Sequence, residues 1–154
     1  MKGAGLAIIL LALFAGCDSR SKAPDFTLPS VEDKNEQITL SAFTTEHPVL
    51  LVFWATWCPS CVLEIPTLNE WHDKYSARGL KILAIDVQEP ADQALNFMKE
   101  NPLRYLSVTD ENGEVASRYG LAGLPSSLFL AKGGKILYYG FGLPENMEQL
   151  LAQN

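Results

Sequence analysis

The sequence predicts one α/β domain built around a mixed β-sheet. Two continuous apolar runs, at residues 49–55 and 81–87, are typical of strands buried on both faces. Helical periodicity follows each run, and strands that alternate with helices indicate parallel pairing. A hairpin with Gly133 and Gly134 at its turn adds antiparallel strands near the end. With 154 residues and 47% hydrophobic content, the chain can bury one core of its own.

The elements of this domain are predicted in chain order. An N-terminal β-hairpin pairs residues 26–28 with 37–40 across a polar turn, before the strand at 49–55. The helix after that strand covers 59–78, because apolar residues recur at spacings of three and four, and Gly79 ends it. The remaining predicted elements are the strand at 81–87, a helix at 91–100, a strand at 105–109, a short helix at 114–119, strands at 127–131 and 135–139, and a C-terminal helix after Pro144.

Residues 1–16 resemble a cleavable export signal. Lys2 carries their only charge, and the apolar run after it has about 11 residues, fewer than the roughly 20 of a membrane-spanning helix. The segment that ends at Cys17 resembles the lipobox of bacterial lipoproteins, in which the cysteine carries a lipid; an ordinary signal peptide is the alternative. We therefore expect residues 17–25 to form a lipid-anchored tether and residues 26–154 to form the domain.

This N-terminus also predicts a location. A lipid on Cys17 would hold the protein on the outer side of a membrane, where disulfides persist. Asp18 resembles the signal that retains lipoproteins on the inner membrane of Gram-negative cells. In such a cell, the domain would lie on the periplasmic side of that membrane.

Composition argues against nucleic acid and metal as partners. The net charge is −6 and no basic cluster is present, so nothing attracts a phosphate backbone. Zinc takes four ligands, and only His47, His72 and Cys17 could join Cys58 and Cys61. We expect no nucleic acid, no metal and no cofactor.

Cys58 and Cys61 stand where thiol-disulfide chemistry is favoured. They lie at the junction of the buried strand and the helix, with Pro59 at the first helical position, where its missing N–H costs nothing. The helix N-terminus favours a thiolate at Cys58, and Cys61 returns to the same side one turn later. A structural disulfide is the alternative, although closing so short a loop stabilises little. Cys58 is the expected attacking thiol and Cys61 the resolving thiol.

The segment WCPSCVLEIP, at positions 57–66, resembles the membrane-anchored, extracytoplasmic thioredoxin-like proteins of the TlpA-like and ResA-like type. The resemblance covers residues 24–152. It implies a thioredoxin fold, in which helices flank a central mixed sheet, with an N-terminal hairpin as an extension. It also implies a thiol-disulfide oxidoreductase that reduces exported proteins, apocytochrome c among them. A membrane thiol donor such as a DsbD-like or CcdA-like protein would restore the dithiol.

The substrate surface is expected around the cysteine pair. Trp57, next to a cysteine that we expect to be exposed, would form its lip, and Pro59 and Ser60 would lie beside it. The segment 123–126 matches the loop in which thioredoxin-like folds carry a cis-proline. A cis bond before Pro125 would leave the backbone of Leu124 free to pair with an extended substrate segment.

Glu64 is the expected proton acceptor. It shares one side of the helix with Cys61, and no cationic residue stands three or four positions away. Partial burial should therefore raise its pKa and let it exchange a proton with Cys61, a role that the resemblance also implies. Asp86 and Glu89 are expected to lie in a surface loop near the site.

Two other functions stay open. A thiol peroxidase has a related fold, but in that group a threonine stands three residues before the reactive cysteine, whereas Thr56 stands two before Cys58. A Sco-like copper chaperone has more widely spaced cysteines and a histidine late in the chain, whereas no histidine follows His72. Peroxide consumption and copper binding by the reduced protein distinguish these alternatives.

Overall fold

The structure is a computed structural model that describes residues 22–154. Its elements follow the predicted order of a β-hairpin, a βαβαβα unit and a final ββα unit, with one short helix added after the hairpin. The expected export signal and lipid attachment at Cys17 lie outside the described residues and stay predictions. At the end of the expected tether, Lys22 forms a β-bridge with Lys135, and the Ala23 amide donates to the Gly134 carbonyl at 2.9 Å.

The N-terminal hairpin pairs β1 (Thr27–Pro29) with β2 (Gln37–Thr39) in antiparallel register. Its second strand ends one residue earlier than predicted. The Leu40 side chain is buried, and the residue begins a short helix, α1 (Leu40–Thr44), which the sequence did not predict. Asp25 supports this helix because its carboxylate accepts a hydrogen bond from the Ser41 amide at 2.9 Å.

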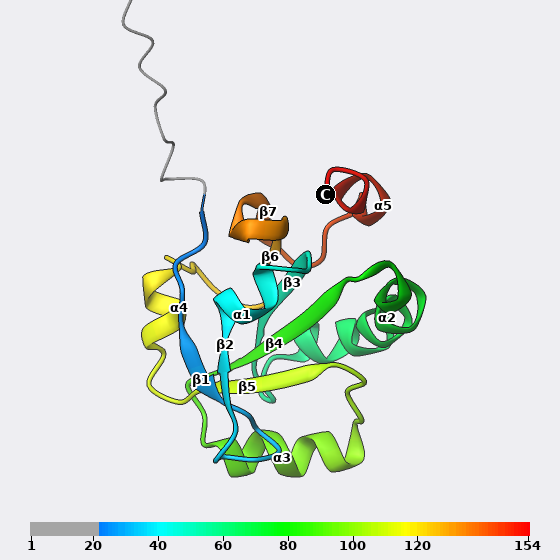
Figure 1. The fold of residues 1–154 in the computed structure, drawn as a ribbon. Helices are drawn as coiled ribbons and strands as arrows, with labels where there is room; N and C mark the ends of the chain where they lie inside the picture. The colour runs from blue at the N-terminus through cyan, green and yellow to red at the C-terminus, as the bar shows by residue number, and fades with distance from the viewer. Residues whose placement is uncertain (1–21) are drawn as a thin grey trace, which may run out of the picture.

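A five-stranded mixed sheet forms the centre of the domain (Figure 1). Its order is β5 (Leu106–Asp110), β4 (Lys81–Val87), β3 (Val49–Trp54), β6 (Ser126–Leu130), β7 (Ile136–Phe141). Strands β3, β4 and β5 are parallel, whereas β6 runs antiparallel to both β3 and β7. All six residues of β3 are buried, as a continuous apolar run predicts for a central strand. The predicted fold class is confirmed.

Helices cover both faces of this sheet. On one face, α2 (Pro59–Tyr75), α3 (Ala91–Glu100) and α5 (Met147–Leu151) pack against Leu50, Val52 and Trp54. On the other face, the hairpin and α4 (Glu114–Arg118) cover Val49, Leu51 and Phe53. A 3₁₀ turn, η2 (Ser76–Arg78), continues α2 to the predicted stop at Gly79, and η3 (Lys132–Gly134) forms the turn between β6 and β7.

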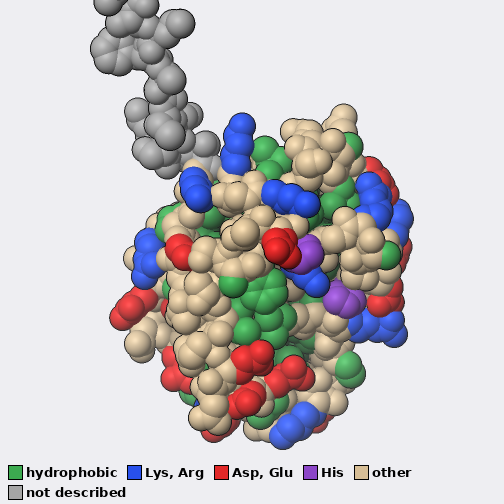
Figure 2. All heavy atoms as spheres, viewed as in Figure 1, with side chains coloured by type: hydrophobic (Ala, Val, Ile, Leu, Met, Phe, Trp, Pro, Cys, Tyr) green, Lys and Arg blue, Asp and Glu red, His purple; other side chains and the backbone are tan. Residues whose placement is uncertain are grey.

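The hairpin side of the domain carries uneven charge. Figure 2 shows hydrophobic side chains that reach the surface near its middle and a group of acidic side chains below them. No helix within residues 22–154 is long and apolar enough to cross a bilayer.

Candidate thiol-disulfide site

Cys58 and Cys61 form a disulfide at the beginning of α2, with their Cα atoms 5.3 Å apart. A turn after β3 places them there, because the Cys58 amide donates to the Ala55 carbonyl at 3.2 Å. Cys58 has an extended backbone and is the N-cap residue, and its sulfur accepts a hydrogen bond from the Cys61 amide at 3.3 Å. Pro59 is the first helical residue, as the sequence predicts.

The two cysteines differ from prediction in their exposure. Cys58 is only 5% exposed and Cys61 3% exposed, and both belong to the hydrophobic cluster that contains Trp54 and Leu68. The expectation of an exposed Cys58 was wrong, because the apolar strand end and the helix bury both sulfurs in this disulfide state. Trp57 is instead the exposed neighbour, at 59%.

The loop before β6 completes one wall of the site. The bond between Leu124 and Pro125 is cis, as the resemblance implies. Within residues 22–154, neither the amide nor the carbonyl of Leu124 has a hydrogen-bond partner, whereas the Pro125 carbonyl accepts from the Gly142 amide at 3.1 Å. Trp57 and Leu124 line the same hollow of about 390 Å³, and Pro59 and Ser60 are exposed at the start of the helix. The structure therefore brings the expected substrate residues to one end of the sheet.

Glu64 lies one turn after Cys61 and is half-buried. Its Oε2 atom is buried without a hydrogen-bond partner among the described residues. Desolvation raises the pKa of Glu64 to about 7, partly offset by a hydrogen bond from the Leu143 backbone. No ion pair within residues 22–154 includes this carboxylate. The predicted rise of the Glu64 pKa is confirmed.

The surroundings of Glu64 include residues that the sequence did not identify. A Cβ atom at Gly142 would lie 3.1 Å from Glu64 Oε1, so only glycine leaves ordinary space for the carboxylate. Burial raises the pKa of the Tyr105 phenol, and the charge of Glu64 adds to that rise. Both residues are more than 35 positions from Glu64 in the sequence, and no motif marks either of them.

Asp86 and Glu89 are more buried than predicted, and Asp86 also belongs to a different element. Asp86 belongs to β4 and is fully buried, and Glu89 is only 4% exposed. The carboxylate of Glu89 accepts hydrogen bonds from the backbone amide and the hydroxyl of Thr56, both at 2.6 Å. The expectation of a surface loop was wrong for Asp86. Glu89 does lie in the loop after β4, but it is buried there, because α3 and the neighbouring strands cover this end of β4.

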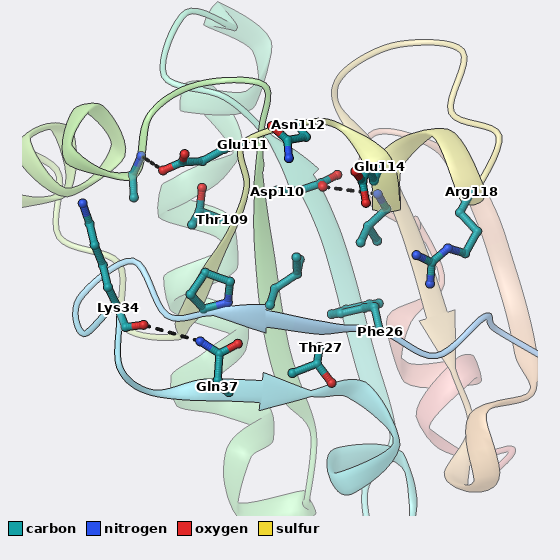
Figure 3. A pocket seen from close by; sticks show the side chains of 14 residues that line it. Phe26, Thr27, Lys34, Gln37, Thr109, Asp110, Glu111, Asn112, Glu114 and Arg118 are labelled. Carbon is teal, nitrogen blue, oxygen red and sulfur yellow. Dashed lines mark hydrogen bonds between the residues drawn. The ribbon is translucent and has the colours of Figure 1, made fainter.

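Another hollow, of about 430 Å³, lies between the hairpin and the β5–α4 connection (Figure 3). Phe26, Lys34, Glu111 and Arg118 are among its lining residues, whereas neither cysteine nor Glu64 reaches it. This hollow is larger than the one beside Trp57 and Leu124, so volume alone would place the thiol-disulfide site away from the cysteine pair. The chemistry of the cysteine pair, rather than concavity, locates it.

Comparisons with known proteins agree with this site. Residues 20–139 match the model of the AhpC/TSA family. The chain is 36% identical over 134 residues to the thiol-disulfide oxidoreductase ResA of Bacillus thuringiensis subsp. konkukian, which covers 86% of this chain and 76% of the relative. ResA of Geobacillus thermodenitrificans is 34% identical over 116 residues, covering 75% of this chain and 65% of the relative.

Two solved structures extend the comparison to the fold. A Chlorobium tepidum protein assigned as the thiol:disulfide interchange protein DsbE superimposes with a TM-score of 0.78 at 31% identity, covering 86% of this chain and 94% of the other. StoA from Bacillus subtilis superimposes with a TM-score of 0.68 at 27% identity, covering 86% and 97%. The chain therefore belongs to the thioredoxin-fold AhpC/TSA family, among the ResA-like thiol-disulfide oxidoreductases.

Proposed function

We propose that the protein reduces disulfides of exported proteins through Cys58 and Cys61. The observation that carries this proposal is the cysteine pair at the start of α2, beside a loop in which the Leu124 backbone has no partner among the described residues. The Cys58 thiolate attacks one sulfur of a substrate disulfide, forms a mixed disulfide and releases the other sulfur as a thiolate. Cys61 then attacks the sulfur of Cys58 and releases the second substrate thiol. The substrate gains two electrons, and the Cys58–Cys61 disulfide remains.

Glu64 accepts the proton that Cys61 must lose before its attack. A pKa of about 7 leaves this carboxyl partly ionised at neutral pH, which suits a group that both takes and returns a proton. Since Cys61 and Glu64 are one helical turn apart, their titrations are coupled.

An extended, apolar segment of the substrate fits the surface around the pair. The Leu124 amide and carbonyl, which have no partner within residues 22–154, are available for strand-like pairing, and Trp57 and Phe141 are 59% and 67% exposed. Phe141 lies next to this loop, since a Cβ atom at Gly123 would be 3.5 Å from its ring. Pro59 and Ser60 border the same surface beside the exchanging sulfur.

The site operates outside the cytoplasm in this proposal. The export signal and Cys17 support a lipid-anchored protein on the outer side of a membrane, which is the periplasmic side of the inner membrane in a Gram-negative cell. A reductant placed there needs electrons from inside the cell, which a DsbD-like or CcdA-like membrane protein would deliver. Resemblance to ResA-like proteins supports apocytochrome c among the substrates.

Trapping of substrates tests the roles of the two cysteines. Cys61→Ser removes the resolving thiol, so substrates should accumulate as mixed disulfides with Cys58, whereas the matched variant Cys58→Ser should trap few. Equal trapping by both variants would contradict the assignment. The reduction potential of the Cys58–Cys61 pair tests whether the protein reduces or oxidises its substrates. A potential above that of typical exported protein disulfides would make the protein an oxidant.

A further inference from the structure

Asp86 is a buried carboxylic acid that takes no part in the exchange steps proposed for Cys58, Cys61 and Glu64. It is fully buried, and neither of its carboxyl oxygens has a hydrogen-bond donor among the described residues. In register, it lies between Trp54 on β3 and Thr109 on β5, so the three side chains share one face of the sheet. The polar atoms of Trp54 and Thr109 are also buried without partners within residues 22–154. Among the described residues, an ionised Asp86 would therefore have no hydrogen-bond donor to stabilise its charge.

Asp86 instead faces other carboxyl groups. Its side chain lies within hydrogen-bonding reach of Glu89, and the charges of Glu89 and Glu111 both oppose its ionisation. Glu111 comes from the β5–α4 connection and accepts a hydrogen bond from the Ala91 amide at 3.0 Å. Figure 3 marks a hydrogen bond at the Glu111 carboxylate. No cation of the described residues is among the groups that act on Asp86. Burial and these two neighbours raise the pKa of Asp86 to about 9.

Glu89 is the hydrogen-bond acceptor of the pair, because donors surround it. It accepts hydrogen bonds from the amide and the hydroxyl of Thr56 at 2.6 Å and from the Gln93 side chain at 2.6 Å. Thr56 stands two residues before Cys58, in the turn that carries the cysteine to the helix. A neutral Asp86 can donate its proton to Glu89, which turns a repulsive contact between two carboxylates into a hydrogen bond.

We propose that Asp86 is a positioning residue for thiol-disulfide exchange: as a neutral acid it donates a hydrogen bond to Glu89, which in turn holds Thr56 and the segment that presents Cys58. When Asp86 releases its proton to solvent, two carboxylates repel each other and the hold on Thr56 weakens. The inference rests on the exchange reaction at Cys58 and adds a second titrating group, separate from Glu64, that controls it.

The decisive variant is Asp86→Asn, because asparagine has a similar shape and can still donate to Glu89 but cannot ionise. In the oxidised full-length protein, the ¹⁵N–¹H signal of the Thr56 amide should shift with a midpoint near pH 9, the pKa of Asp86. In Asp86→Asn, that transition should be absent. A transition with the same midpoint in both proteins, or no transition in either, overturns the proposal.

The reaction itself gives a second readout. The rate at which a small thiolate reduces the Cys58–Cys61 disulfide, expressed per thiolate, should fall roughly fivefold through the same midpoint, which corresponds to about 1 kcal/mol. The rate in Asp86→Asn should stay level there. A merely structural Asp86 would change stability without changing this pH profile. The Thr56 signal does not depend on substrate, so a failure of the proposed reductant function would be distinguishable from a failure of this proposal.

Two further variants serve as controls. Asp110→Asn also replaces a buried carboxyl at a strand end, but Asp110 has its own donors in the Val115 and Ala116 amides, so the Thr56 transition should persist. Glu89→Gln removes a charge that opposes ionisation of Asp86, so the midpoint should move to lower pH. This variant keeps the proposal testable if Asp86→Asn does not fold, and an unchanged midpoint in Glu89→Gln would overturn it.

Discussion

At the scale of single residues, three carboxyl groups show how surroundings set acidity. Glu148 is exposed, and hydrogen bonds from Arg78 and Tyr75 lower its pKa to about 2. Glu64 has no cationic partner within residues 22–154 and is half-buried, so its pKa rises to about 7. Asp86 is fully buried among other acids, and its pKa rises to about 9. Only the two groups with raised pKa values lie near the cysteine pair, where proton transfer accompanies exchange.

The raised pKa of Glu64 predicts a dependence of stability on pH. The folded protein keeps this proton up to about pH 7, whereas the unfolded chain loses it near 4.5. Because the folded state binds more protons in that window, the contribution of Glu64 to stability falls as pH rises from about 4.5 to about 7. For a half-exposed group, we expect a loss of about 1–2 kcal/mol after screening by solvent.

Urea unfolding of the oxidised protein at several pH values measures this contribution. Glu64→Gln cannot ionise, so relative to the unsubstituted protein it should gain stability across that window. Glu70→Gln is the matched control, since Glu70 is exposed on the same helix. If the free energy of unfolding depends on pH in the same way in the unsubstituted protein and in Glu64→Gln, the proposed desolvation of Glu64 is contradicted.

At the scale of secondary structure, the sequence predicts elements better than their environments. The run at 49–55 predicted a strand buried on both faces, and every residue of β3 is buried. Periodicity predicted α2 and its stop at Gly79, because local backbone preferences decide both. Asp86 was misplaced because its burial depends on α3 and on two neighbouring strands, which no local pattern describes.

Contacts between distant elements escaped prediction for the same reason. The site joins the start of α2 to the end of β7, where Gly142 approaches Glu64. In the sequence, Gly142 is only a glycine before Leu143 and Pro144, which indicates a turn. Its importance arises from the packing of α2 against this turn.

A substitution at Gly142 tests this contact between elements. Gly142→Ala should raise the pKa of Glu64 further. The added methyl group would lie 3.1 Å from Glu64 Oε1, where it displaces water and crowds the hydrogen bond that the carboxylate accepts from the Leu143 backbone. Gly142 has a φ of +68°, so strain should also destabilise the fold by about 1 kcal/mol. A ¹³C carboxyl titration of Glu64 in the oxidised protein measures the pKa.

Gly120→Ala is the matched control for strain. Gly120 has a φ of +66°, but no atom of the described residues lies within 4 Å of the position that a Cβ atom would take. Gly120→Ala should therefore destabilise the fold about as much as Gly142→Ala does, and it should leave the pKa of Glu64 unchanged. If both variants shift the Glu64 pKa equally, the contact with Gly142 does not control it.

At the scale of the whole molecule, the chain enters the domain far from the cysteine pair. Lys22 and Ala23 contact Lys135 and Gly134, at the turn between β6 and β7. Since β6 is antiparallel to β3, this turn lies at the end of the sheet where β3 begins, whereas Cys58 follows the end of β3. The five residues of β6 separate the two ends by roughly 17 Å. A membrane anchor before residue 22 would therefore leave the site facing away from its attachment.

This separation predicts that anchoring and catalysis are independent. Cys17→Ala should release the full-length protein from membranes, because the lipid would be lost and no helix within residues 22–154 can span a bilayer. Its rate of disulfide reduction with a soluble substrate should equal that of the unsubstituted protein, since Lys22 and Ala23 enter the domain at the opposite end of the sheet from Cys58. Cys58→Ser provides the converse control, because it should lose exchange activity and stay with the membrane.

Fractionation after a high-salt wash measures where each variant is located. A Cys17→Ala protein that still sediments with membranes would show that a lipid on Cys17 is not the anchor.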